Sequence, residues 1–157
     1  MNRKLRDNWI DEAFTEARKG IELNAGGPFG AVMVQNGKVI SRAHNEVLKT
    51  MDPTAHAEII AIRRASEILQ TYDLSSCILY TTCYPCPMCM GAIFWARIPI
   101  AYYASSAQDA AEGGFDDQIF HEKISHPQNA LDLRPVDPHM GKELFALWAA
   151  KEDKKRY

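Results

Sequence analysis

Two short motifs, far apart in the sequence, constrain the fold most strongly because together they offer the ligands of one metal ion. His56-Ala57-Glu58 is the first motif, and Pro85-Cys86-Pro87-Met88-Cys89 is the second. A catalytic zinc usually takes three protein ligands and leaves its fourth position to water. Because His56, Cys86 and Cys89 form such a set, the sequence predicts a fold that brings the two segments together.

The Cys-x-x-Cys pair has other possible uses. In a reducing compartment such a pair binds metal or is redox-active more often than it forms a structural disulfide. Cys83 could add a fourth ligand and close a structural zinc site, and a thioredoxin-like redox pair is a second alternative. Glu58, beside the proposed ligand His56, favours a catalytic site because a purely structural zinc needs no neighbouring carboxylate. Cys77 lies in an apolar run and is expected to be a buried residue without a chemical role.

Composition limits the class of protein. The chain has 157 residues, enough for one domain with a hydrophobic core, and we expect a single domain over residues 1–157. No stretch approaches the roughly 20 apolar residues of a membrane span, and no apolar signal core follows the N-terminus, so we expect a cytoplasmic protein. The net charge of −2 disfavours a dedicated nucleic-acid binder.

The pattern of apolar residues and turn signals predicts alternating strands and helices. Asn36-Gly37 is a strong hairpin signal between two strands, and Pro87 suits the first position of a helix. This order predicts an α/β fold in which helices cover a mixed sheet of about five strands. We expect helices at about 7–23, 55–70, 87–97 and 141–153, short helices at 107–111 and 116–122, and strands at 29–34, 39–44, 77–82, 98–104 and 130–136.

The predicted site suits a hydrolytic reaction. Zinc lowers the pKa of its bound water, and Glu58 can take the proton. The resulting hydroxide would attack a ring carbon that carries an exocyclic amine. Glu58 would then return protons to the ring nitrogen and to the leaving amine, so that ammonia departs and a carbonyl remains.

With these motifs in hand, the chain resembles the cytidine-deaminase-like superfamily, whose nucleobase deaminases carry His-x-Glu followed by Pro-Cys-x-x-Cys. Within the superfamily it is most similar to the small bacterial guanine deaminases. The resemblance implies a three-layer α/β/α fold and conversion of the free purine base guanine to xanthine and ammonia. It is carried by Gly26–Val32, Asp52–Glu58, Pro85–Cys89, Phe94–Arg97, Ala110–Asp117 and Tyr157.

The resemblance also implies roles for individual residues. It assigns His56, Cys86 and Cys89 to one zinc per subunit, and it assigns catalytic proton transfer to Glu58 and Asp117. The implied substrate contacts are Phe29, Asn45, Ala57, Asp117 and Tyr157. The family further suggests a homodimer that exchanges a C-terminal segment of about 115–157, with Gly113-Gly114 as the crossing point.

Tyr84 departs from the family pattern, because many relatives carry Glu before Pro-Cys. This change removes a charge beside the metal ligands and weakens the substrate assignment. Three alternatives to guanine deamination stay open: deamination of another amino-heterocycle such as cytosine or an aminotriazine, deamination of tRNA adenosine, and a non-catalytic zinc-stabilised binding module. The small basic cluster from Lys151 to Arg156 is explained more simply by a solvated helix end than by nucleic-acid binding.

Overall fold

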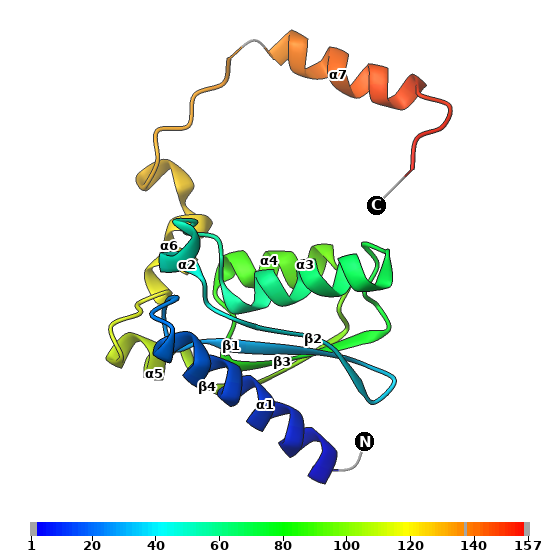
Figure 1. The fold of residues 1–157 in the computed structure, drawn as a ribbon. Coiled ribbons are helices and arrows are strands. Elements are labelled where there is room, and N and C mark those ends of the chain that lie inside the picture. Colours follow the sequence, from blue (N-terminus) through cyan, green and yellow to red (C-terminus); the bar gives the residue numbers. More distant parts are fainter. Residues whose placement is uncertain (1–2, 137, 156–157) are drawn as a thin grey trace. The chain divides into compact units, whose positions relative to one another are not determined.

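The computed structural model describes residues 3–136 and 138–155 (Figure 1). Its backbone contacts divide the chain into two compact units, Met1–His121 and Glu122–Tyr157, and each is described by itself. The single domain over 1–157 stays a prediction. None of the helices in the described parts of the chain has the length and apolar character that crossing a membrane requires.

The first unit is built on a mixed sheet of four strands in the order β2-β1-β3-β4. β1 runs antiparallel to β2 and β3, whereas β3 and β4 are parallel. Gly30–Val34 of β1 are all buried, because helices cover both faces of the sheet. The strands are β1 Gly30–Gln35, β2 Lys38–His44, β3 Cys77–Cys83 and β4 Ile100–Ser105.

The predicted hairpin joins β1 to β2. Asn36 and Gly37 have φ angles of 50° and 74°, so both adopt the left-handed backbone that a two-residue hairpin turn requires. Gln35 and Lys38 form the last pair of the ladder. The turn starts the ladder, and an irregularity between Met33 and Val34 shifts its register before Gly30, at the start of β1, pairs with His44 at the end of β2.

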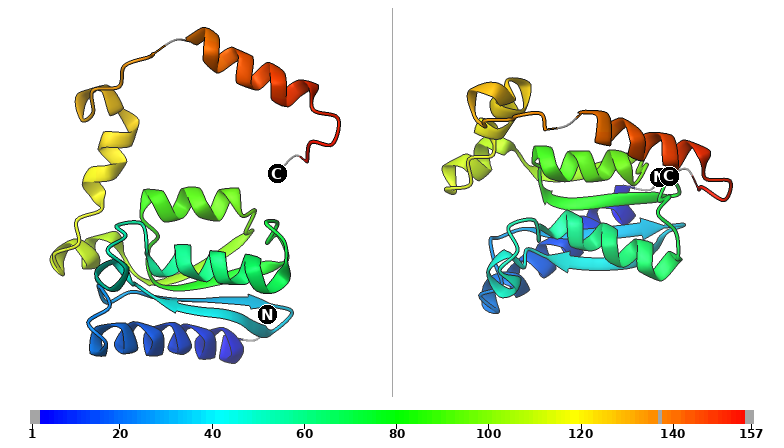
Figure 2. Two further views of the ribbon diagram at one scale, coloured as in Figure 1. Left: turned by 45° about the horizontal axis from the view of Figure 1, so that its top comes forward. Right: turned by 90° about the horizontal axis from the view of Figure 1, so that it is seen from above.

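Three helices complete the three layers of the first unit. Figures 1 and 2 show α1 (Arg3–Glu22) on one face of the sheet, and α3 (Ala57–Leu69) and α4 (Pro87–Trp95) side by side on the other. Because side chains alternate along a strand, Val32 packs toward α1, and Met33 packs in the cluster of α3 and α4. The predicted α/β/α architecture is confirmed.

The remaining helices are short, apart from the last one. The expected helices at 107–111 and 116–122 are present with shifted bounds, and a short helix after β2 was not expected. Ser106 and Asp109 form a reciprocal capping box at the start of the fifth helix. These elements are α2 Val47–Thr50, α5 Ala107–Glu112, α6 Gln118–Ser125, the 3-10 helix η1 Pro127–Asn129 and α7 Pro138–Ala150.

The strand predicted at 130–136 is wrong. In the described part of the chain these residues form a bend and irregular backbone and join no strand ladder. Pro135 cannot donate a ladder hydrogen bond. The side chains of Asp132 and Arg134 form an exposed ion pair of 2.6 Å within the segment itself. Local β-propensity without a pairing partner does not make a strand, so the sheet has four strands rather than five.

Candidate metal centre and substrate cavity

Two helix starts meet at the predicted metal site. His56 is the N-cap of α3 and Cys86 is the N-cap of α4, both with extended backbone. Pro87 takes the first helical position, as predicted, which places Cys89 within the first turn of α4. Helix N-termini favour thiolates because unpaired N–H groups and the helix dipole stabilise negative charge.

The donor atoms have the spacing of a tetrahedral zinc site. His56 Nδ1 lies 3.6 Å from Cys86 Sγ and 3.6 Å from Cys89 Sγ, and the three atoms lie within 4.8 Å of one another. Zinc bonds of about 2.0 Å to nitrogen and about 2.3 Å to sulfur, at tetrahedral angles, separate these atoms by about 3.6 Å. The three residues therefore fit zinc and leave one coordination position open.

Cys83 does not join this cluster. Its thiol donates a 3.5 Å hydrogen bond to the carbonyl of Ser106, the residue that directly follows β4. The metal-ligating group found among the described residues contains His56, Cys86 and Cys89 and no fourth cysteine or histidine. The geometry thus favours an open site over a closed structural one. Cys77 is buried in β3, as expected.

Glu58 lies beside the metal ligands in the first turn of α3. One carboxylate oxygen accepts a hydrogen bond from the Thr81 hydroxyl at 3.2 Å, and the other accepts one from the Cys89 thiol at 3.5 Å. Burial raises the pKa of the Glu58 carboxyl. The two ligand thiols are coupled. The hydrogen bond with Cys89 lowers the pKa of Cys86 to about 4, and the same hydrogen bond, together with burial, raises the pKa of Cys89.

A cavity of about 400 Å³ opens beside this cluster, within the usual size range for a small ligand. Glu58, Phe29, Asn45 and Asp117 all line it, so the first unit brings these four residues and the predicted metal ligands His56 and Cys86 to one space. Burial raises the pKa of Asp117. The other lining residues are Gly26, Gly27, Val47, Leu48, Pro53, His56, Cys83, Tyr84, Cys86 and Phe115.

Ala57, a predicted substrate contact, does not line this cavity. It is completely buried in the hydrophobic core at the start of α3. Tyr157 lies outside the described residues.

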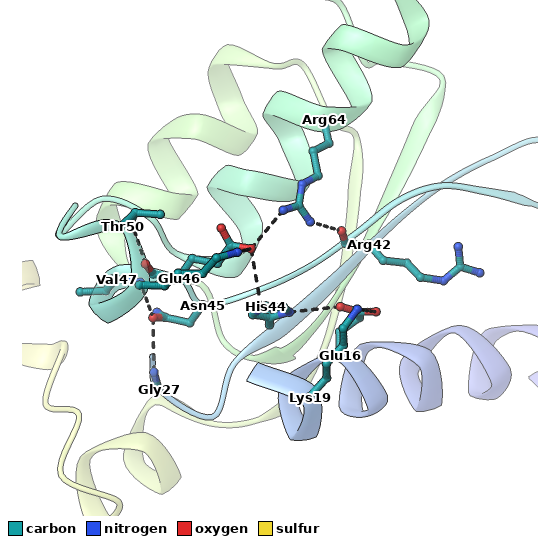
Figure 3. A network of polar contacts seen from close by, with 11 residues as sticks. Glu16, Lys19, Gly27, Arg42, His44, Asn45, Glu46, Val47, Thr50 and Arg64 are labelled. Atoms are coloured by element: carbon teal, nitrogen blue, oxygen red, sulfur yellow. Dashed lines mark hydrogen bonds and ion pairs between the residues drawn. The ribbon is translucent and has the colours of Figure 1, made fainter. Parts of the chain in front are cut away.

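The side-chain amide of Asn45 is oriented by the backbone. Its Oδ1 accepts hydrogen bonds from the N–H groups of Gly27 at 3.3 Å and Val47 at 3.2 Å (Figure 3). With the oxygen occupied, the NH₂ group is what Asn45 can offer to a ligand in the cavity. Gly26 makes this arrangement possible, because a Cβ there would lie 2.0 Å from Asn45 Oδ1.

The sequence did not identify two aromatic residues that line the cavity, Phe115 and Tyr84, or the hydrogen-bond partner of Glu58, Thr81. Phe115 packs edge-on against Phe29, with ring centroids 4.9 Å apart at 83°. Tyr84 packs edge-on against Tyr103 at 5.2 Å. Thr81, which binds Glu58, was read only as a strand residue. Phe115 could have been predicted as a cavity residue because it lies two positions before Asp117. Tyr84 was noted only because many relatives carry Glu at this position before Pro-Cys.

Comparison with known proteins adds an independent finding. Residues 3–105 match the family model of the cytidine and deoxycytidylate deaminase zinc-binding region. The chain is 42% identical to guanine deaminase of Bacillus subtilis (strain 168) over 153 residues, which are 96% of this chain and 98% of that protein. An X-ray structure of guanine deaminase from Bacillus subtilis matches with a TM-score of 0.94 and covers 100% of this chain and 99% of its own.

Two further relatives match a smaller share of the chain. A structure of guanine deaminase from Nitrosomonas europaea matches with a TM-score of 0.66 and 29% identity, covering 87% of this chain and 70% of that one. A tRNA-specific adenosine deaminase of Aquifex aeolicus (strain VF5) is 40% identical over 109 residues, which are 69% of this chain and 70% of that protein.

Proposed function

The chain belongs to the cytidine and deoxycytidylate deaminase family, and we propose that it is a zinc-dependent hydrolase that converts guanine to xanthine and ammonia. One observation carries the choice of guanine. The match to Bacillus subtilis guanine deaminase covers 96% of the chain, whereas the match to the Aquifex aeolicus tRNA deaminase covers 69%. The likeness to guanine deaminase thus includes most of the chain beyond the zinc-binding region.

Proton transfer is assigned to Glu58. When bound at His56, Cys86 and Cys89, zinc would acidify a water molecule so that it can attack at neutral pH. The Glu58 carboxylate, held by the Thr81 hydroxyl, takes the proton and returns protons to the ring nitrogen and the leaving amine. His56 is the N-cap of α3 and Glu58 lies in its first turn, so α3 would place the base beside the residues that hold the metal.

The cavity offers groups that complement guanine. The Asn45 NH₂ donates to an acceptor on the purine, its ring nitrogen or its carbonyl oxygen. The Asp117 carboxylate accepts from the N–H and amino groups of the base or carries a second proton. The edge-on pair of Phe29 and Phe115 packs against the ring. A pyrimidine is smaller than guanine and presents a different hydrogen-bonding edge. It would leave polar groups of the cavity without partners, so its turnover should be lower.

The test is a panel of substrates with the purified zinc-loaded protein. Ammonia release is measured with guanine, cytosine, an aminotriazine and a tRNA anticodon arm, and xanthine is followed by absorbance. Preference for guanine supports the proposal. Turnover of the tRNA arm without guanine would favour the second candidate, a tRNA adenosine deaminase, for which the identity to the Aquifex aeolicus protein is the supporting observation.

We also propose a cytoplasmic homodimer that exchanges a C-terminal segment within the predicted range of about 115–157. The exchanged part begins after Asp117, because Phe115 and Asp117 line the cavity of their own chain. Support comes from apolar side chains that the units do not bury by themselves. On α4, Phe94 and Trp95 are each 71% exposed. The second unit is too small to bury the apolar residues of α7, among them Phe145 and Trp148, within a core of its own. Light scattering coupled to gel filtration tests the dimer.

A further inference from the structure

A cluster of ionisable side chains, of which His44 and Glu46 are buried, surrounds the short segment that carries Asn45. His44 and Glu46, its two neighbours in the sequence, are only 5% and 8% exposed. Figure 3 shows Asn45 turned toward Gly27, whereas His44 extends toward Glu16 of α1. The segment is therefore fixed on both sides of the residue proposed to bind the base.

The cluster links the two helical layers around the end of β2. His44 Nδ1 lies 3.2 Å from a Glu16 oxygen, and His44 Nε2 lies 3.6 Å from a Glu46 oxygen. Arg64 of α3 donates to the same Glu46 oxygen at 3.1 Å and to the Arg42 carbonyl at 2.7 Å. The Glu46 carboxylate is thus held between the His44 imidazole and the Arg64 guanidinium, and the exposed Lys49 ammonium lies 3.5 Å from the same oxygen.

The backbone leaves the imidazole little room to move. A Cβ added at Gly20 of α1 would lie 2.9 Å from His44 Cβ and 3.1 Å from the ring. In the part of the chain that the structure describes, His44 Nε2 is a buried nitrogen without a hydrogen bond, and the carboxylate of Glu46 is near it. Close packing against a glycine gives the ring one defined position rather than a range of positions.

Backbone hydrogen bonds connect the cluster to the site. The Asn45 N–H donates to the carbonyl of Phe29 at 3.0 Å, and the Glu46 N–H donates to the carbonyl of Ala55 at 3.0 Å. Ala55 directly precedes the metal ligand His56. A shift of Glu46 would therefore move Asn45 relative to the segment that enters the metal site.

We propose that His44 and Glu46 are positioning residues that hold the Asn45 amide toward the bound base. The inference rests on the proposed function, in which Asn45 contacts the substrate. Both residues act through Asn45 and touch no reacting atom. Removing either contact lets the amide depart from its productive orientation. Because the contact exists in the bound ground state as well as in the transition state, the loss falls mainly on KM.

The test is a double-mutant cycle. His44→Gln and Glu46→Gln are each expected to lower kcat/KM for guanine about tenfold, a size typical of coupled neighbours. In an Asn45→Ala background the same substitutions should change kcat/KM by less than about twofold, because their target is gone. Equal effects in both backgrounds would overturn the proposal. Glu12→Gln is the matched control, since Glu12 lies on the same helix as Glu16 but pairs with the exposed side chain of Arg42.

A second readout needs no substrate. The chain has six asparagines, and Asn45→Ala identifies the side-chain amide signal of Asn45 in a spectrum of protein labelled with ¹⁵N-asparagine. His44→Gln and Glu46→Gln should shift this signal, and Glu12→Gln should leave it in place. An unchanged signal in both test variants overturns the proposal even if guanine is turned over. A shifted signal in a protein that does not deaminate guanine supports positioning and overturns the proposed function instead.

Discussion

Replacing Asn45 by aspartate should lower the turnover of guanine while leaving the stability of the protein nearly unchanged. Asn45 Oδ1 accepts two backbone hydrogen bonds, from Gly27 and Val47. A carboxylate can accept both of them, so Asn45→Asp should keep the loop closed. The variant nevertheless replaces the NH₂ donor that faces the cavity with an acceptor. We expect kcat/KM for guanine to fall at least ~10²-fold, because the buried acceptor would face an acceptor on the base.

Asn45→Ala is the matched comparison, and unlike Asn45→Asp it should lower the stability of the protein. It leaves the N–H groups of Gly27 and Val47 without their partner. At about 1 kcal/mol for each hydrogen bond, the free energy of unfolding should fall by about 2 kcal/mol. In a chain of this size that loss lowers the melting temperature by about 4–8 °C. Asn45→Asp should stay close to the wild type in the same measurement.

The assay follows ammonia release from guanine alongside thermal unfolding monitored by circular dichroism. Zinc content is measured in each preparation to confirm that the metal site is intact. Near-normal turnover by Asn45→Asp would refute the assignment of the amide nitrogen as a substrate donor. A lower melting temperature for Asn45→Asp than for Asn45→Ala would refute the stated role of the amide oxygen.

The remaining predictions concern the metal and the C-terminus. Cys86→Ala should lose zinc and much of the stability, because metal binding is coupled to folding. Cys83→Ser should retain zinc. Metal analysis and thermal unfolding check both variants. Chelation of the wild type should lower the melting temperature, and an unchanged value would contradict the metal site. Deleting the last residues with Tyr157 should reduce guanine turnover while zinc content stays normal. If the C-terminus completes the partner's site, mixing Glu58→Gln with the truncated chain should restore activity, and proven heterodimers without activity would exclude the exchange.

Much of the fold follows from local signals in the sequence. Asn36-Gly37 specifies the hairpin turn because both positions need positive φ. Pro87 indicates a helix start because proline suits the first helical position. The metal ligands were predictable for a similar reason. Cys86 and Cys89 converge through the geometry of one helical turn, and only His56 had to be brought in from another element.

The features that escaped prediction depend on contacts between distant segments. The orientation of Asn45 is set by an N–H of Gly27, and the Glu58 carboxylate is held by Thr81 from a neighbouring strand. Neither pairing leaves a periodic or motif signal. The strand expected at 130–136 failed for the complementary reason, because β-propensity was judged without a partner strand and against Pro135.

The most direct test of the central claim is the kcat/KM of the zinc-loaded protein for guanine, measured with Glu58→Gln as the matched control. The account predicts xanthine and ammonia in equal amounts from the wild type. It also predicts a loss of at least ~10²-fold in Glu58→Gln, with zinc content and melting temperature preserved. Near-normal turnover by Glu58→Gln, or turnover of cytosine or a tRNA arm while guanine stays unreacted, would contradict it.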